Sequence, residues 1–140
     1  MPTIEKKLRL SVPPAALYRA ISAELESWLC RQATLSRRVD GEDELQFDQE
    51  SRPLRLKVLA LDKDERVAWR VLDAPDPAWK DTIISLLVHR SGAGCALTLA
   101  HERFRDDFSP GFLRANQRWE QALRQLKHHL EKDDPFSALG

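Results

Sequence analysis

Residues 109–131 read SPGFLRANQRWEQALRQLKHHLE, and this stretch decides the fold. Ser109 and Pro110 supply the N-cap and the first-turn proline that favour the start of a helix. Apolar side chains then recur at the three- and four-residue steps of one helical face: Phe112, Ala115, Trp119, Leu123, Leu126 and Leu130. A helix from Pro110 to Glu131 would span roughly 33 Å, long enough to lie across a small sheet. The pattern therefore predicts a long amphipathic helix that covers a sheet.

The middle of the chain is expected to supply the strands of that sheet. Alternating and apolar runs predict them over residues 33–39, 44–48, 54–61, 66–72, 79–90 and 95–104. Turn formers separate most of these runs, at residues 40–43, 62–64, 74–77 and 92–94. The acidic run over residues 40–44 is expected at the exposed tip of a hairpin.

The N-terminal part of the chain predicts one more strand and two short helices. The strand is expected where apolar residues alternate with polar ones, at Ile4, Leu8, Leu10 and Val12. Pro13 and Pro14 end it and favour the first turn of a helix over residues 15–21. A second short helix is expected over residues 24–30, where apolar side chains stand three and four positions apart.

This order of elements predicts an α+β domain, an antiparallel sheet of about seven strands curved around the last helix. The two short helices stand between the first and second strands. The length of 140 residues is that of one ordinary domain. We expect a single domain over residues 1–132, followed by a C-terminal tail over residues 133–140.

Composition narrows the class of protein. Lysine and arginine number 22, as do aspartate and glutamate, so no net field would draw the chain to nucleic acid or an anionic membrane. No apolar run reaches membrane-spanning length, and residues 1–10 do not form a signal peptide. We expect a cytoplasmic protein without membrane insertion. Cys30 and Cys95 lack any CxxC spacing and are expected to be reduced, packed thiols.

Four stretches, taken in order, resemble the SRPBCC superfamily, which includes START domains, birch-pollen-allergen-like proteins and aromatase/cyclases. They are VPPA at 12–15, VAWRV at 67–71, WKDTII at 79–84 and the segment 92–102 that ends in LTLAHE. With the tryptophan-bearing last helix, they resemble most the bacterial homologues of the activator of the Hsp-ninety ATPase. The resemblance covers essentially the whole chain. Ile83 and Leu87 depart from it, because the family usually looks polar there.

The resemblance implies a helix-grip fold with a cavity between the sheet and the last helix. Such a cavity can hold a lipid-like or aromatic molecule. The superfamily hosts carriers, sensors, cyclases and chaperone partners, so the fold alone does not imply one chemistry.

Strand alternation and the helical face point one set of side chains toward this expected cavity. The candidate ligand-binding residues are Trp28, Leu56, Trp69, Thr82, Ile84, Leu86, Leu97, Leu99, His101, Phe112, Trp119 and Leu123. The alternative is that they simply form a packed core. Large flat side chains combined with few polar groups favour a small-molecule pocket.

His101 and Thr82 are the polar residues of this set. His101 could bind a ligand or titrate near neutrality; the alternative, which we favour, is a histidine satisfied by backbone or by Glu102. Thr82 could offer its hydroxyl to a ligand. We favour the alternative that Thr82 simply fills a strand position as a β-branched residue.

Two groups of residues suggest a catalytic triad or a metal site, but their spacing along the chain excludes both. Asp81, Ser85 and His89 share one face of a strand, but residues four apart on a strand are separated by roughly 13 Å, too far for a triad. His128 and His129 diverge by about 100° on a helix and cannot share one metal ion. We therefore expect no catalytic residue, no metal site and no cofactor.

Three functions remain open. The leading hypothesis is a carrier or sensor that binds an apolar or lipid-like small molecule. The second is a protein-interaction domain, either a homodimer or a chaperone-ATPase-activator-like protein with a chaperone partner, that uses Ile83 and Leu87 on the outer face of the sheet. The third is a cyclase or hydrolase with His101 as acid or base, which needs a second polar group beside it.

Overall fold

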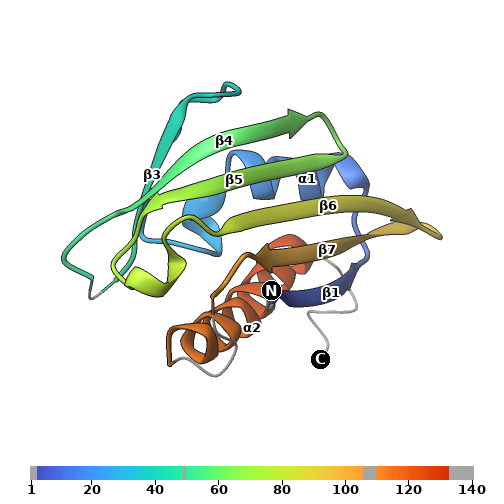
Figure 1. Ribbon diagram of the computed structural model, residues 1–140. Helices are drawn as coiled ribbons and strands as arrows, with labels where there is room; N and C mark the ends of the chain where they lie inside the picture. Colours follow the sequence, from blue (N-terminus) through green and yellow to red (C-terminus); the bar gives the residue numbers. More distant parts are fainter. Residues whose placement is uncertain (1–2, 49, 106–109, 133–140) are drawn as a thin grey trace.

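The computed structural model describes residues 3–48, 50–105 and 110–132. Its centre is a curved seven-stranded antiparallel sheet in the order β1-β7-β6-β5-β4-β3-β2 (Figure 1). The strands are β1 (Ile4–Leu10), β2 (Gln32–Thr34), β3 (Glu42–Gln46), β4 (Leu54–Asp62), β5 (Arg66–Asp73), β6 (Ile83–Ser91) and β7 (Gly94–Glu102). The helices are α1 (Pro14–Ser22) and α2 (Pro110–Glu131), with 3-10 turns η1 (Leu25–Ser27) and η2 (Pro77–Trp79). The predicted helix-grip fold is confirmed.

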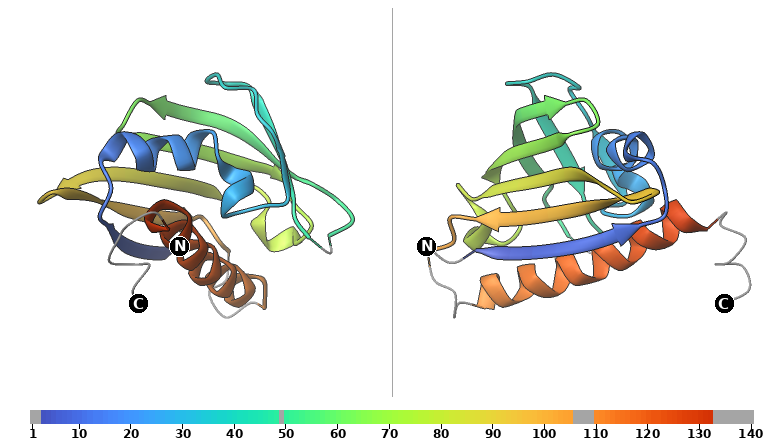
Figure 2. Two further views of the ribbon diagram at one scale, coloured as in Figure 1. Left: turned by 180° about the vertical axis from the view of Figure 1, so that it is seen from behind. Right: turned by 90° about the vertical axis from the view of Figure 1, so that its right-hand side faces the viewer.

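Helix α1 begins where the two prolines predicted it. Pro13 is extended and Pro14 occupies the first turn, where a missing N–H leaves no hydrogen bond unmade. The helix buries Leu17, Ala20 and Ile21 against β5, β6 and β7. The view from behind shows α1 lying across the sheet (Figure 2).

Helix α2 spans the predicted residues and lies on the same side of the sheet as α1 (Figure 2). It contacts β1 and η2 on the sheet side, and α1 and η1. Its buried face carries Ala115, Trp119, Leu123 and Leu126, the apolar stripe that the sequence predicted. The expected N-cap Ser109 and the expected tail over residues 133–140 lie outside the described residues.

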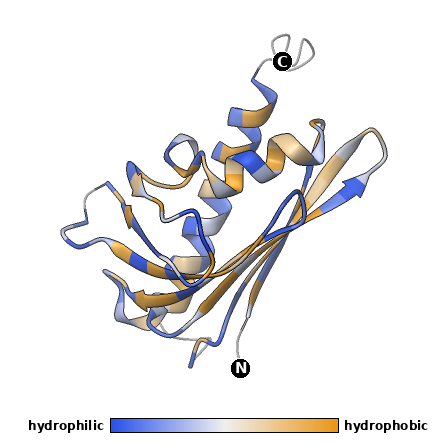
Figure 3. Cartoon of the chain, turned by 90° about the horizontal axis from the view of Figure 1, so that it is seen from above, coloured by the Kyte–Doolittle hydropathy of each residue, from blue (hydrophilic) through white to orange (hydrophobic). Residues whose placement is uncertain are grey.

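The central strands form a continuous apolar layer beneath the helices. In the paired register, Trp69 stands opposite Val58 and Ile84, and Leu86 stands opposite Leu99. Figure 3 shows hydrophobic and hydrophilic residues alternating along these strands. Gly94 is needed where β7 meets β1, because a Cβ there would lie 2.1 Å from the Leu10 carbonyl oxygen.

Three predicted elements are shorter than expected by at least three residues. The strand predicted over 79–90 begins only at Ile83, because Pro77–Trp79 forms η2 and Asp81 has a φ of 67°. The helix predicted over 24–30 is a single 3-10 turn, η1. The strand predicted over 33–39 ends at Thr34, and Arg37 adopts a φ of 60°, a left-handed conformation that interrupts extended backbone.

The acidic run over residues 40–44 is not wholly exposed, which corrects the expectation for it. Asp43 is only 4% exposed. Its carboxylate accepts hydrogen bonds from Trp69 Nε1 at 3.1 Å, Ser36 N at 2.8 Å and Ser36 Oγ at 3.0 Å. A buried carboxylate needs such partners, so Asp43 ties β3 to the tryptophan of β5.

Both cysteines are buried free thiols, as predicted. Burial raises the pKa of the Cys30 thiol to about 12 and also raises the pKa of Cys95. The thiolate is the reactive form, so both side chains act as small apolar groups at neutral pH.

Candidate functional site

The residues predicted to line a cavity come together between the sheet and α2. All of them except Phe112 are buried, and Phe112 is half-buried. The apolar members belong to one cluster, and Thr82 and His101 are its polar neighbours. The structure therefore brings the set together, and the expectation that these residues contact a ligand stays a prediction.

A chain of hydrogen bonds crosses this core from α2 to η2. Trp119 Nε1 donates to His101 Nδ1 at 3.0 Å. His101 Nε2 lies 2.8 Å from Thr82 Oγ1, and the Thr82 hydroxyl donates to the Trp79 carbonyl oxygen at 2.5 Å. Because Nδ1 accepts a bond and the threonine proton is already used, His101 carries its proton on Nε2.

His101 is neutral in this setting. Burial lowers its pKa to about 3, because the imidazolium would lose its hydration in the core. Its partners are Thr82 and Trp119, which corrects the expectation that backbone or Glu102 would satisfy it. Thr82 does not fill a strand position, as we expected, because β6 begins only at Ile83; its hydroxyl instead joins His101 to the Trp79 carbonyl oxygen. A His101 that acted as acid or base would first have to give up one of these bonds.

The same chain holds an aromatic cluster around Trp79. The Trp79 and Trp119 rings stack with centroids 6.2 Å apart and an interplanar angle of 19°. The His101 ring meets Trp79 edge-on at 4.8 Å, and Phe104 packs 4.4 Å from His101 on another side. Such contacts add to area burial, so the orientation of Trp79 is strongly determined.

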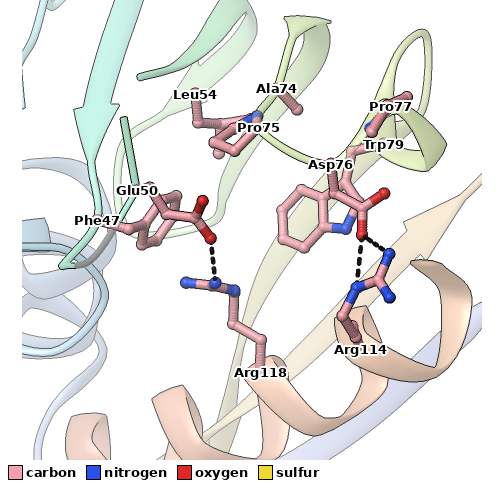
Figure 4. Close-up of a pocket in the computed structure, with 10 residues that line it drawn as sticks. All are labelled: Phe47, Glu50, Leu54, Ala74, Pro75, Asp76, Pro77, Trp79, Arg114 and Arg118. Carbon is pink, nitrogen blue, oxygen red and sulfur yellow. Dashed lines mark hydrogen bonds and ion pairs between the residues drawn. The ribbon is translucent and has the colours of Figure 1, made fainter. Parts of the chain in front are cut away.

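Trp79 forms one wall of a pocket of about 240 Å³ (Figure 4). The pocket lies between the first half of α2, the segment that joins β3 to β4, and the segment from β5 to η2. It is lined by Phe47, Glu50, Leu54, Ala74, Pro75, Asp76, Pro77, Trp79, Arg114 and Arg118. None of these is among the predicted cavity residues.

Two arginine–carboxylate pairs stand at the helix side of this pocket. Arg114 Nε and Nη2 donate to Asp76 Oδ2 at 2.9 and 2.7 Å, and Asp76 Oδ1 accepts from Ala78 N at 3.0 Å. Arg118 Nη2 donates to Glu50 Oε1 at 3.3 Å (Figure 4). The Arg118 guanidinium also lies 4.5 Å above the Phe47 ring.

A second hollow of about 620 Å³ lies further along α2, toward η1. Its lining consists of Glu26, Ser27, Trp28, Leu29, Cys30, Arg31, Phe47, Asp48, Arg118, Gln121, Ala122 and Gln125. Trp28 is the one predicted cavity residue in this lining. Phe47 and Arg118 line both hollows.

Sequence reasoning missed the pocket for a local reason. Most of its residues stand outside the strands, where no two-residue period marks them. One signal was present: Arg114 and Arg118 are four apart on α2, which places them on the same face of the helix. Their spacing by itself does not show that each arginine has a carboxylate partner from another part of the chain.

Ile83 and Leu87 lie on the opposite face of the sheet from the helices and are half-buried. In register, Ile83 stands between Arg70 and Glu102, and Leu87 stands between Arg66 and Thr98. Neither contributes to the pocket.

Within residues 3–48, 50–105 and 110–132, no group of three His, Cys, Asp or Glu side chains is arranged to hold a metal ion. His129 Nε2 lies 3.0 Å from Glu24 Oε1, which links the end of α2 to the start of η1. Among the helices so described, none is both long and apolar enough to cross a bilayer.

Comparison with known structures finds the same fold in bacterial proteins. The Aha1 dimer from Colwellia psychrerythraea superposes with a TM-score of 0.82 at 20% identity, over 96% of this chain and 99% of that one. A protein from Mesorhizobium loti gives 0.84 at 23% identity, over 95% and 99%. CalU16 from Micromonospora echinospora gives 0.74 at 17% identity, over 98% and 79%. At these identities the likeness shows the fold alone.

Comparison with sequence families is more specific. None of the curated proteins matches the chain at a significant level. The model of the family described as "Activator of Hsp90 ATPase homolog 1-like protein" matches residues 11–131. These include the opening of α1, the strand and turn motifs noted above and the whole of α2. The chain therefore belongs to the family of activator of Hsp90 ATPase homolog 1-like proteins.

Proposed function

We propose that this protein is a carrier or sensor that binds a compact, apolar small molecule in the pocket beside Trp79. The observation that carries the proposal is the pocket itself, whose walls combine Trp79, Leu54 and Pro75 with a few polar groups at the helix side. This is the usual composition of a small-molecule site.

The wall of the pocket is organised before any ligand arrives. Trp79 is held by its stack on Trp119 and by the bond from Thr82 to its carbonyl oxygen. Pro75 and Pro77 restrict the backbone on either side of Asp76. A wall that needs no reordering loses less conformational entropy on binding, so a small apolar contact area suffices for useful affinity.

The charges around the pocket favour a neutral ligand. Each arginine at the helix side is paired with a carboxylate, Arg114 with Asp76 and Arg118 with Glu50. The two pairs cancel, so the pocket offers no unpaired charge among these four groups to attract an ion. Apolar contact would then supply affinity, and the paired polar groups would orient the ligand.

The test is a fluorescence titration with the neutral apolar probe N-phenyl-1-naphthylamine. We expect saturable binding to the wild type and at least tenfold weaker binding to Pro75→Trp, which fills the pocket without removing a core side chain. Leu113→Ala is the matched control, because Leu113 is 54% exposed on α2 and lies outside the pocket lining. Equal binding by the wild type and Pro75→Trp would overturn the proposal.

A protein-interaction role is the second candidate. The relative from Colwellia psychrerythraea is described as a dimer, and the family takes its name from an ATPase activator. In this chain, Ile83 and Leu87 offer apolar surface on the face of the sheet away from the helices. That surface could join two copies or receive a chaperone-type partner.

A further inference from the structure

We propose that Arg118 is a movable wall that sets the length of ligand the pocket accepts. The inference rests on the proposed function. Its starting point is that the pocket beside Trp79 and the larger hollow near η1 share two lining residues, Phe47 and Arg118. The Arg118 side chain therefore stands at the boundary between the two spaces.

The contacts described for Arg118 are of weak kinds. Its ion pair with Glu50 is 3.3 Å long, and the two side chains are 37% and 33% exposed. Pairs this exposed contribute little to stability because water and salt screen them. The cation–π contact with Phe47 is a single contact of modest strength on a ring that is itself buried. The side chain can therefore leave this position at little cost.

Arg114, one turn earlier on α2, is held in place by more and shorter hydrogen bonds than Arg118. Two of its nitrogens donate to one oxygen of Asp76, and the other oxygen accepts from the backbone of η2. The Arg114 side chain is 63% exposed and that of Asp76 is 20% exposed, so this pair differs from the Arg118 pair in the number and length of its hydrogen bonds and not in burial. Charge-assisted bonds of this length are the stronger kind. The Arg114 side of the pocket is therefore rigid, and Arg118 is the part that yields.

Movement of Arg118 would join the two hollows along α2. The pocket of about 240 Å³ would then open into a space of about 620 Å³, where apolar side chains such as Trp28 and Ala122 stand among polar ones such as Gln125. With Arg118 in place, only a compact ligand fits beside Trp79. With Arg118 displaced, an extended chain could run from Trp79 toward Trp28. Arg118 is thus a specificity-determining residue for ligand length.

The experiment uses a series of neutral n-alkan-1-ols, from butanol to dodecanol, to displace N-phenyl-1-naphthylamine. Each methylene that enters an apolar site should tighten binding roughly fourfold. In the wild type we expect this gain to stop at a short chain length. In Arg118→Ala the gain should continue to longer alcohols by at least two methylenes. Arg124→Ala is the matched control, because Arg124 is exposed on the same helix outside both linings.

A second variant tests the same idea without removing the side chain. Glu50→Gln removes the ionic partner of Arg118, and we expect a limit between those of the wild type and Arg118→Ala. If thermal unfolding shows that Arg118→Ala is not folded, the chain-length limit of Glu50→Gln alone tests whether Arg118 sets the ligand length. The same chain-length limit in the wild type and these variants overturns the movable wall and leaves the proposed function standing. If no alcohol displaces the probe from any variant, the proposed function and this inference both fail.

Discussion

Trp119 Nε1 donates a hydrogen bond to His101 Nδ1 across 3.0 Å, inside the core. Through Thr82, this bond connects α2 to the turn that presents Trp79 to the pocket. The hydrogen bonds of the packed core therefore also hold a wall of the candidate site in position. Removing one of these bonds should lower the free energy of unfolding and change the shape of the pocket wall.

Trp119→Phe should destabilise the protein. Phenylalanine keeps much of the apolar contact but removes the indole N–H, which leaves His101 Nδ1 without its donor in the core. An unsatisfied buried acceptor costs about 1–3 kcal/mol, and we expect the free energy of unfolding in urea to fall by that amount. Leu113→Ala is the control on the exposed face of the same helix. Coincident urea midpoints for Trp119→Phe and the wild type would show that the bond has no energetic role.

The stability of the protein should depend on pH through His101. The folded pKa is lowered from 6.5 to about 3, so between these values the unfolded state binds the proton and the folded state does not. The contribution of His101 is therefore complete above pH 6.5 and is lost as the pH falls toward 3. One such proton corresponds to a slope of about 1.4 kcal/mol per pH unit.

The measurement is the difference in unfolding free energy between the wild type and His101→Gln across that range. Glutamine offers an acceptor and a donor but does not titrate. We expect the wild type to lose its advantage steadily below pH 6.5. Parallel pH profiles for the two proteins would contradict a neutral His101 in the folded state.

Asp43→Ala should also destabilise the protein, because Trp69 Nε1 and Ser36 N would lose their acceptor. The expected loss is about 1–3 kcal/mol for the buried donor that is left unsatisfied, read from thermal and urea unfolding. Glu44→Ala provides the comparison, since Glu44 is exposed on the neighbouring position of β3. If both variants unfold alike, the Asp43 carboxylate is not a structural acceptor.

Native mass spectrometry of freshly purified protein should separate the two candidate functions. The small-molecule proposal predicts an added mass that is present in the native spectrum and absent from the denatured one. A dimer without added mass would instead favour the protein-interaction role of the sheet face that carries Ile83 and Leu87. In that case Leu87→Glu should convert the dimer to a monomer, because a buried unpaired charge is strongly unfavourable at an interface.

The sequence by itself determined the class of fold and most of the core. The 22-residue helix α2 and the inward faces of β4 to β7 follow from periods of 3.6 and two residues. Such periods are local properties, and they report which side chains must share one apolar layer. For the same reason, Trp69, Trp119 and His101 could be placed in the interior without coordinates.

Only the tertiary structure decided the partners of the polar residues and the position of the pocket. Asp43 meets Trp69, Arg114 meets Asp76 and Arg118 meets Glu50 across separations of 26, 38 and 68 residues. No local period encodes a pair at such a distance. The pocket also depends on the turn after Asp76 and on the left-handed Asp81, which take Trp79 out of the expected strand. Local patterning therefore specified which residues are buried in the core, whereas long-range pairing and the turns between strands decided which residues form the pocket.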